Sequence, residues 1–352
     1  MNKLKIAYFG TPYVSSRFLE KLLTDTSIKR LIEVKFVITQ SDKPVGKEKI
    51  ITPSPVKKTA NKYSIKVYDQ NVKDIKDKIK KLDFVLIYAY GFKQYIPADI
   101  LSLPKIKFSD TNSGFINIHP SLLPLYRGAS PIAYPLILGD KKTGVSIFVL
   151  DEKMDHGPIL AQEKINIEPN DMRSDLEVKL TDLGFEMFKR MILNNDSGVV
   201  PTLAGLPGMT ATVQDHSKTT HARFLTKDDG FIPLPLLKQG LDNLTLSFNE
   251  LPNIIKEFIT KYSVSSMTRS YKDDTYQASK IIFNLFHGLY PWPSLWTLVR
   301  INGIEKRLKI IDMRFKSNQL SNQASKLTIH RVQLEGKKEV DFKTFNSAYA
   351  IF

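Results

Sequence analysis

Two polar side chains two residues apart, Asn117 and His119, are the residues of this chain best suited to chemistry. They alternate with apolar residues in the run F-I-N-I-H over residues 115–119, so both leave the same face of a predicted strand. Pro120 removes a backbone donor and disfavours helix at the residue before it, which ends the strand there. A carboxamide can hydrogen-bond an oxyanion on a carbonyl, and an imidazole moves protons near neutral pH. The pair suits acyl-group chemistry, and the alternative is an ordinary pair of satisfied core residues.

The segments that follow are unusual for simple connections. Residues 120–132 read P-S-L-L-P-L-Y-R-G-A-S-P-I, in which prolines and a glycine surround one arginine, Arg127. Residues 143–160 read T-G-V-S-I-F-V-L-D-E-K-M-D-H-G-P-I-L, an apolar strand followed by Asp151 and Asp155. Two polar motifs therefore follow two neighbouring predicted strands.

These motifs, in this order and at this spacing, resemble the signature of the folate-dependent formyltransferases. The R-G-A-S-P-I extension over residues 127–132 resembles in particular the members of that family that act on methionyl-tRNA. The resemblance implies a catalytic trio of Asn117, His119 and Asp155. Asp155 matches the family aspartate by its place in the D-H-G triplet, whereas Asp151 does not.

The elements around the motifs alternate between strands and helices. An apolar run at 4–9, Gly10 and a helical apolar stripe read as strand, turn and helix, and residues 32–39 form a second predicted strand. Residues 83–89 are continuously apolar, which is typical of a parallel strand buried on both faces. The patterns predict an α/β fold with a Rossmann-like, mostly parallel open sheet and helices on both faces. A dinucleotide site would need G-x-G-x-x-G after the first strand, and Gly10 stands there alone, which excludes a nicotinamide cofactor.

Open α/β sheets bind ligands at the carboxyl ends of their strands, where both polar motifs and the turn after residue 89 are expected. The resemblance implies 10-formyltetrahydrofolate as a consumed co-substrate and no permanently bound cofactor. The folate contacts that it implies are Ala89, Tyr90, Gly91, Ser121, Leu122, Leu123 and Pro124. The cleft-lining residues that it implies are Gly10, Thr11 and Pro12.

The formal net charge of +15 suggests a polyanionic partner. Residues 40–58 contain lysines, Gly46 and three prolines with little secondary-structure pattern, and they resemble the family's tRNA-contacting loop. A G-K-K near the C-terminus also matches the family. The residues predicted to bind tRNA are Lys43, Lys47, Lys49, Arg127, Lys337 and Lys338. The alternative for such lysines is a solvated surface.

A stretch with several glycines and prolines and no periodicity marks the best domain boundary. The predicted domains are a catalytic domain at 1–194, a linker at 195–220 and a second, more basic domain at 221–352. Short strand-like runs in the second domain suit a smaller OB-like β-barrel that binds tRNA; they lie at 295–301, 308–315 and 327–334. Residues 233–274 have no clear counterpart in the family pattern and look like an insertion.

Composition excludes several classes of partner and site. No apolar run approaches the roughly 18 residues of a membrane span, so no membrane partner is expected. The chain has no cysteine, and its histidines outside the motif lack ligand-like spacing, so no metal is expected. Residues 3–9 already read as a strand, so neither a secretory signal nor a transit peptide is expected. The insertion and the divergent C-terminal motifs favour a mitochondrial location, with a bacterial cytoplasm as the alternative.

The resemblance implies formyl transfer from 10-formyltetrahydrofolate to the amino group of methionine on initiator methionyl-tRNA, for translation initiation. Asn117 and protonated His119 would stabilise the tetrahedral oxyanion, while Asp155 would hold the imidazolium and help to remove the amine proton. Two alternatives stay open. One is another folate-dependent N-formyltransferase, acting on glycinamide ribonucleotide or an amino sugar, and the other is a non-catalytic RNA-binding protein on this scaffold.

Overall fold

The structure is a computed structural model, which describes residues 3–46, 48–89, 91, 96–109, 111–193, 211–262, 276–316 and 326–352. Of the residues predicted to bind ligands, Lys47 and Tyr90 lie outside these ranges, as do 195–210 of the predicted linker and 263–274 of the predicted insertion. The chain divides into two interleaved units. The first lies within 1–131, 143–165 and 177–222, and the second within 132–142, 166–176 and 223–352.

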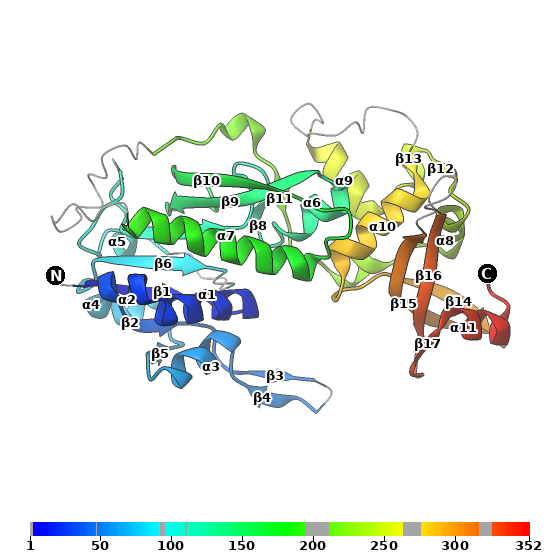
Figure 1. Ribbon diagram of the computed structural model, residues 1–352, viewed down its shortest axis with the longest axis horizontal. Helices are drawn as coiled ribbons and strands as arrows, with labels where there is room; N and C mark the ends of the chain where they lie inside the picture. The colour runs from blue at the N-terminus through cyan, green and yellow to red at the C-terminus, as the bar shows by residue number, and fades with distance from the viewer. Residues whose placement is uncertain are drawn as a thin grey trace. The chain divides into compact units, whose positions relative to one another are not determined.

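A seven-stranded sheet forms the centre of the first unit (Figure 1). Its strands are β1 (Leu4–Phe9), β2 (Ile32–Ile38), β5 (Lys66–Tyr68), β6 (Phe84–Tyr88), β7 (Phe115–His119), β9 (Lys142–Val149) and β10 (Ile159–Asn166). The spatial order is β10-β9-β7-β6-β1-β2-β5, and the five strands from β7 to β5 pair in parallel. Strand β9 runs antiparallel to β7. The predicted Rossmann-like, mostly parallel sheet is confirmed.

Helices cover both faces of this sheet. They are α1 (Tyr13–Thr24), α2 (Thr26–Leu31), α3 (Pro55–Lys62), the 3-10 helix η1 (Val72–Ile75), α4 (Lys76–Ile79), α5 (Ala98–Leu101) and α7 (Arg173–Leu193). On one face, Tyr8 of β1 stacks on Phe18 of α1, which meets Phe185 of α7 edge-on. On the opposite face, Phe9 joins a buried cluster that includes Ile79 of α4. No helix among the described residues is long and apolar enough to cross a membrane.

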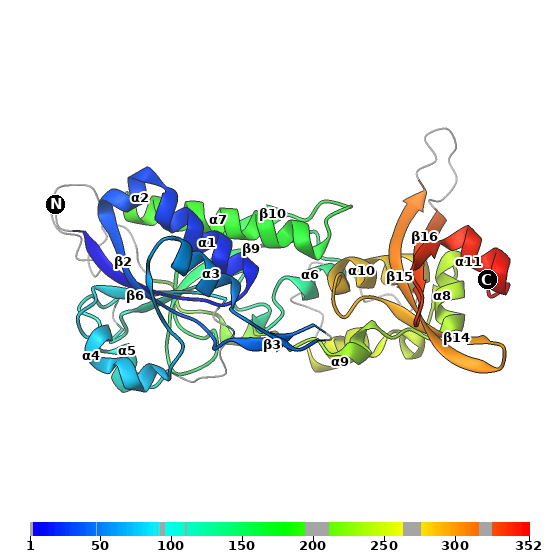
Figure 2. The same cartoon turned by 90° about the horizontal axis from the view of Figure 1, so that it is seen from below.

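The segment at 40–58 is more regular than its sequence suggested. Strands β3 (Lys43–Val45) and β4 (Ile50–Thr52) pair in an antiparallel hairpin, and Pro55 begins α3. Figure 2 shows this hairpin extending away from the sheet. The expectation of little secondary structure was wrong because three-residue strands are too short to show a period. Gly46 lies in the turn after β3 and has a φ of 77°, a backbone conformation that is strained for a residue with a side chain.

The second unit combines helices with a four-stranded antiparallel sheet. Its helices are α6 (Ala133–Leu138), η4 (Lys227–Gly230), α8 (Leu234–Leu241), η5 (Phe248–Glu250), α9 (Asn253–Lys261), α10 (Ala278–Leu289) and α11 (Phe342–Tyr349). Its sheet has the order β14 (Trp296–Ile301), β15 (Ile304–Lys316), β16 (Lys326–Leu334) and β17 (Glu339–Asp341). The pairs are antiparallel, as expected for the smaller C-terminal β unit, and the sheet is consistent with a small barrel.

The described part of the predicted insertion is built into the second unit. Strand β12 (Thr245–Leu246) pairs with β13 (Tyr276–Gln277) directly before α10. Helix α8 packs closely on α10, since a Cβ added at Gly240 would lie 2.3 Å from Cδ1 of Ile282. The extra residues therefore contribute core packing.

A test of the sheet's packing uses Phe18, which is fully buried and contacts aromatic rings of β1, β6 and α7. We expect Phe18→Ala to lower the free energy of unfolding by about 3–5 kcal/mol, because it removes apolar contacts and leaves a cavity. Urea unfolding followed by circular dichroism at 222 nm measures the change. Tyr13→Ala on the same helix is the control, since Tyr13 is 66% exposed and should change stability by less than about 0.5 kcal/mol. Equal losses in the two variants would contradict this packing.

Candidate active site

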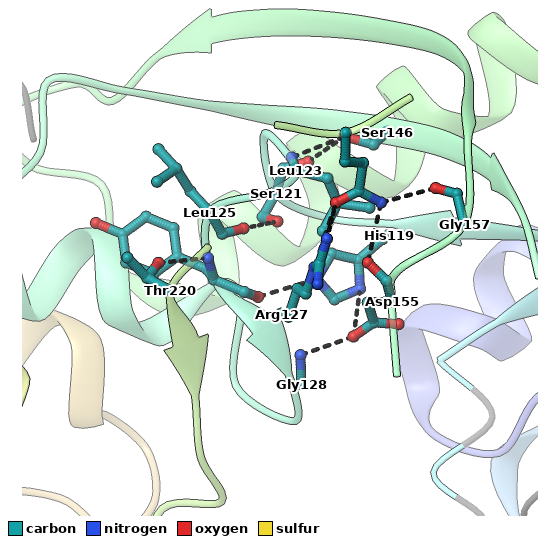
Figure 3. Close-up of polar contacts among 12 residues, drawn as sticks. His119, Ser121, Leu123, Leu125, Arg127, Gly128, Ser146, Asp155, Gly157 and Thr220 are labelled. Atoms are coloured by element: carbon teal, nitrogen blue, oxygen red, sulfur yellow. Dashed lines mark hydrogen bonds and ion pairs between the residues drawn. The ribbon is translucent and has the colours of Figure 1, made fainter. Parts of the chain in front are cut away.

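His119 closes strand β7 and is held at one ring nitrogen (Figure 3). Its Nε2 lies 3.0 Å from the carbonyl oxygen of Tyr126, and a carbonyl can only accept, so Nε2 carries the proton and donates. The other nitrogen, Nδ1, faces Oδ2 of Asp155 at 3.8 Å. The residue is only 5% exposed. The ring is therefore oriented by the backbone, and Nδ1 is the nitrogen left for chemistry.

Asp155 reaches His119 by an unexpected path. Strand β9 is antiparallel to β7, so its end at Val149 lies opposite Ile116, away from His119. We expected the carboxyl end of β9 to place Asp155 beside His119. That expectation about the strand was wrong, because β9 runs antiparallel to β7 and its carboxyl end lies away from His119. The loop after β9 brings Asp155 back toward His119. Asp155 has a φ of 48°, in the left-handed region that residues other than glycine rarely adopt.

The Asp155 carboxylate is anchored by one backbone donor. Its Oδ2 accepts a hydrogen bond of 2.7 Å from the N–H of Gly128, and its side chain is 12% exposed. The carbonyl of Tyr126 and the N–H of Gly128 thus hold the imidazole and the carboxylate from one short stretch of chain. Asp151 has a different partner, since its Oδ2 lies 2.6 Å from Nδ1 of His156. The geometry separates the two aspartates, and only Asp155 faces His119.

Asn117 lies two residues before His119 in β7, so its side chain leaves the same face of the strand. Its Oδ1 is buried and has no hydrogen-bond partner among the described residues. A buried amide oxygen without a donor is costly unless a ligand supplies one. The residue as a whole is half-buried.

One residue outside the sequence motifs, Gln214, joins the site. Gln214 is 4% exposed, and its Nε2 donates to the carbonyl oxygens of Asp155 and Gly157 at 3.0 and 2.8 Å. Its Oε1 accepts from Nε and Nη2 of Arg127 at 3.2 and 2.5 Å. Sequence reasoning missed Gln214 because it lies in an aperiodic segment, and no local signal marks it.

Arg127 occupies a different place from the one expected of a tRNA ligand. It is 5% exposed, and besides Gln214 it donates from Nη2 to Nδ1 of His216 at 2.9 Å. Burial lowers the pKa of the guanidinium, while the carboxylates of Asp155 and Asp151 oppose that shift. A phosphate contact would require these buried bonds to break. We therefore assign the Arg127 side chain to the interior of the site.

Comparison with known proteins places this site in a family. A family model described as "Formyl transferase" matches residues 4–192. The chain belongs to the formyl transferase family. The methionyl-tRNA formyltransferase of Staphylococcus aureus is 30% identical over 353 residues, covering 96% of this chain and 93% of the relative. That of Staphylococcus epidermidis is 35% identical over 245 residues, covering 68% of this chain and 71% of the relative.

A solved structure shows the same fold. The N-formyltransferase from Helicobacter canadensis, in complex with folinic acid and dTDP-3-aminofucose, superposes with a TM-score of 0.52 at 15% identity. The match covers 97% of this chain and 99% of that one. At this identity the likeness shows the fold alone. These relatives are bacterial, so they give the expected mitochondrial location no support.

Most residues expected to contact folate lie in two turns of the first unit. In one, Ser121 and Leu123 are buried, and the turn is fixed by Ser146, whose Oγ donates to the Ser121 carbonyl and accepts from Leu123 N–H. Leu122 and Pro124 are half-buried in the same turn. The structure thus leaves Leu122 and Pro124 as the more accessible members of this turn.

The other turn follows β6. Ala89 and Gly91 both have positive φ values, 47° and 62°, and Gln40 donates to the Gly91 carbonyl. Gly10 follows β1, where a Cβ would lie 1.7 Å from Oγ of Ser15, so only glycine fits. Thr11 is half-buried and Pro12 exposed. Gly91 and Pro12 are thus exposed and Ala89 and Thr11 half-buried, whereas Gly10 is buried.

The other described residues that are predicted to bind tRNA are exposed lysines. Lys43 and Lys49 belong to the β3–β4 hairpin, and Lys337 and Lys338 occupy the turn between β16 and β17. Among the described residues, no group of three or more histidine, aspartate or glutamate side chains is placed to hold a metal ion.

The tautomer of His119 is a direct test of the site. We expect its neutral ring to carry the proton on Nε2, because that nitrogen faces a carbonyl oxygen. His287 is the internal control, since its Nδ1 lies 2.9 Å from the carbonyl of Asp171 and must carry the proton instead. Long-range ¹H–¹⁵N correlation spectra above the imidazole pKa distinguish the two tautomers. An Nδ1-protonated His119 would contradict the described orientation.

Proposed function

We propose that this formyltransferase transfers the formyl group of 10-formyltetrahydrofolate to the amino group of methionine on initiator methionyl-tRNA. The observation that carries the proposal is the approach of Asp155 to Nδ1 of His119 at the end of β7, with Asn117 on the same strand face. The tRNA specificity is supported by relatives named methionyl-tRNA formyltransferase that match almost the whole chain. The likeness to an amino-sugar enzyme concerns the fold alone and does not favour that substrate.

The reaction forms a bond between the methionyl nitrogen and the formyl carbon and breaks the bond from that carbon to N10 of the folate. One proton leaves the amine, and one is delivered to N10. The formyl oxygen becomes an oxyanion in the tetrahedral intermediate, which hydrogen-bond donors stabilise. With Nε2–H of His119 already bound to Tyr126, the donor available from a protonated ring is Nδ1–H.

Asp155 would take the complementary role. Its Oδ2 is 3.8 Å from Nδ1, too long for a hydrogen bond, so the imidazolium proton is free to face an oxyanion while the carboxylate stabilises the positive ring. The same carboxylate would accept the amine proton, directly or through a water. Asn117 would donate from its Nδ2 to the oxyanion, and an incoming amine N–H would satisfy its unpartnered Oδ1.

The folate would contact the turns at 89–91 and 121–124 and the residues Gly10, Thr11 and Pro12. It is consumed as a co-substrate, and the chemistry needs no permanently bound cofactor or metal. We place the reaction in a bacterial cytoplasm, because the compared relatives are bacterial. The second unit, with its OB-like sheet, would bind the tRNA together with exposed lysines of both units.

The chemistry is tested by single substitutions in the trio. We expect Asn117→Ala, His119→Ala and Asp155→Ala each to lower kcat for formylation of methionyl initiator tRNA by about 10²-fold or more, because each removes a group that acts in the transition state. The KM for tRNA should change little. Asp151→Ala is the matched control, since Asp151 bonds His156. Loss of kcat in Asp151→Ala with retention in Asp155→Ala would overturn the assignment, and a wild-type chain without this activity would overturn the function.

The tRNA contact is tested by the salt dependence of binding. Each phosphate contact should lower log K by roughly 0.7–0.9 for each tenfold rise in salt. Replacing Lys43, Lys47 and Lys49 by Ala should therefore reduce the slope and raise the KM for tRNA, leaving the KM for folate unchanged. The control replaces Lys73, Lys80 and Lys81, which are exposed on a different element, for the same loss of charge. Equal slopes in both triple variants would show that the hairpin lysines are only solvated surface.

A further inference from the structure

Gln214 makes four hydrogen bonds with its single side-chain amide, and their chemistry fixes which way the amide points. Nε2 faces the carbonyl oxygens of Asp155 and Gly157, which can only accept. Oε1 faces the guanidinium of Arg127, which can only donate. The reversed amide would set acceptor against acceptor and donor against donor. The orientation is therefore determined, and each N–H of the amide has one carbonyl.

The two carbonyls that Gln214 binds bracket the turn that carries Asp155. Asp155 itself has a φ of 48°, which is unfavourable for a residue with a side chain. Gly157 is packed so closely that a Cβ would lie 1.9 Å from the carbonyl oxygen of Val149. A strained turn persists only when its surroundings over-determine it, and Gln214 supplies two of the bonds that do so.

The turn's geometry decides where the carboxylate lies. The Asp155 side chain has one backbone donor, Gly128 N–H, and faces His119 Nδ1 at 3.8 Å. Without the bonds to its own backbone, the turn could relax to an ordinary φ and swing the carboxylate away from the ring. The hydrogen bonds of Gln214 reach the carbonyls of Asp155 and Gly157 and the guanidinium of Arg127, so its effect on the carboxylate passes through the main chain.

We propose that Gln214, held by the buried guanidinium of Arg127, is a positioning residue that fixes the Asp155 turn so that its carboxylate faces His119. The inference rests on the proposed function for its activity readout. It explains why a guanidinium is buried beside the site: a planar fork with several N–H donors matches an amide oxygen and a neighbouring imidazole together. It also gives a role to the segment 211–222, most of which lies in the predicted linker and which belongs to the first unit.

The test is Gln214→Glu, which keeps the shape and can still accept from Arg127 but has no N–H for the two carbonyls. We expect kcat to fall by about 10- to 100-fold, as for a small misplacement of a reacting group. The KM values for tRNA and folate should stay within about threefold, because Gln214 contacts neither substrate in the proposed mechanism. The control is Gln239→Glu in the second unit, where the side chain bonds Glu250 on the surface, and it should leave kcat unchanged.

A double-mutant cycle separates positioning from a merely structural role. If Gln214 acts through Asp155, then Gln214→Glu should cause little further loss of kcat in an Asp155→Asn background, whereas independent effects would multiply. The histidine ¹⁵N signals of His119 should also shift in Gln214→Glu and not in Gln239→Glu. Full multiplication of the two losses, or an unchanged kcat in Gln214→Glu, would overturn the proposal while leaving the proposed function intact.

Folding of the variants is measured by circular dichroism and urea unfolding before kinetics. If Gln214→Glu does not fold, Gln214→Met, which fills the same space without a charge, takes its place in the cycle. If neither variant folds, Gln214 is a residue of the fold, and the positioning role is wrong. A wild-type chain that does not formylate methionyl-tRNA would overturn the proposed function, and the His119 signals would then decide the positioning role alone.

Discussion

The site depends on one tripeptide, Tyr126 to Gly128, which holds both members of the His119–Asp155 pair. The carbonyl of Tyr126 binds the imidazole, and the N–H of Gly128 binds the carboxylate. The side chain of the residue between them, Arg127, reaches the Asp155 main chain through Gln214. The imidazole of His119, the carboxylate of Asp155 and the turn that carries Asp155 are therefore all held by the same three residues. A shift of these residues would move all three groups together. Such preorganisation lets a site stabilise charge without rearranging during the reaction.

The tripeptide is itself fixed by a distant segment. Strand β8 (Arg127–Gly128) pairs in parallel with β11 (His221–Ala222). The N–H of Tyr126 donates to Oγ1 of Thr220, and that of Arg127 to the Thr220 carbonyl. Gly128 must be glycine, because its φ is 106° and a Cβ would lie 3.0 Å from the carbonyl oxygen of Ala222. The end of the predicted linker and the two residues after it, 220–222, thus belong to the first unit and to the candidate site.

Much of this arrangement follows from local sequence, and the rest does not. Pro120 predicts the end of β7 at His119, and the apolar runs predict the parallel sheet, because steric limits and periodicity act over a few residues. The direction of β9 depends on how it pairs with β7, and local sequence does not determine that pairing. The path by which Asp155 returns to His119 therefore could not be predicted from the motif. The predicted domains are continuous ranges of the chain. They therefore could not describe two units that each contain several separate segments.

Arg127 shows why the remaining part was beyond sequence reasoning. An arginine is expected at the surface because an unpaired buried charge is costly, and the overall positive charge of the chain strengthens that expectation. In the structure, Gln214 and His216 satisfy the guanidinium, and both lie far along the chain in an aperiodic segment. Only the fold brings these partners together, so only the fold changes the energetic balance in favour of burial. Arg127 therefore differs from the exposed lysines that can meet phosphate, because its guanidinium holds Gln214, which bonds the main chain of Asp155 beside His119.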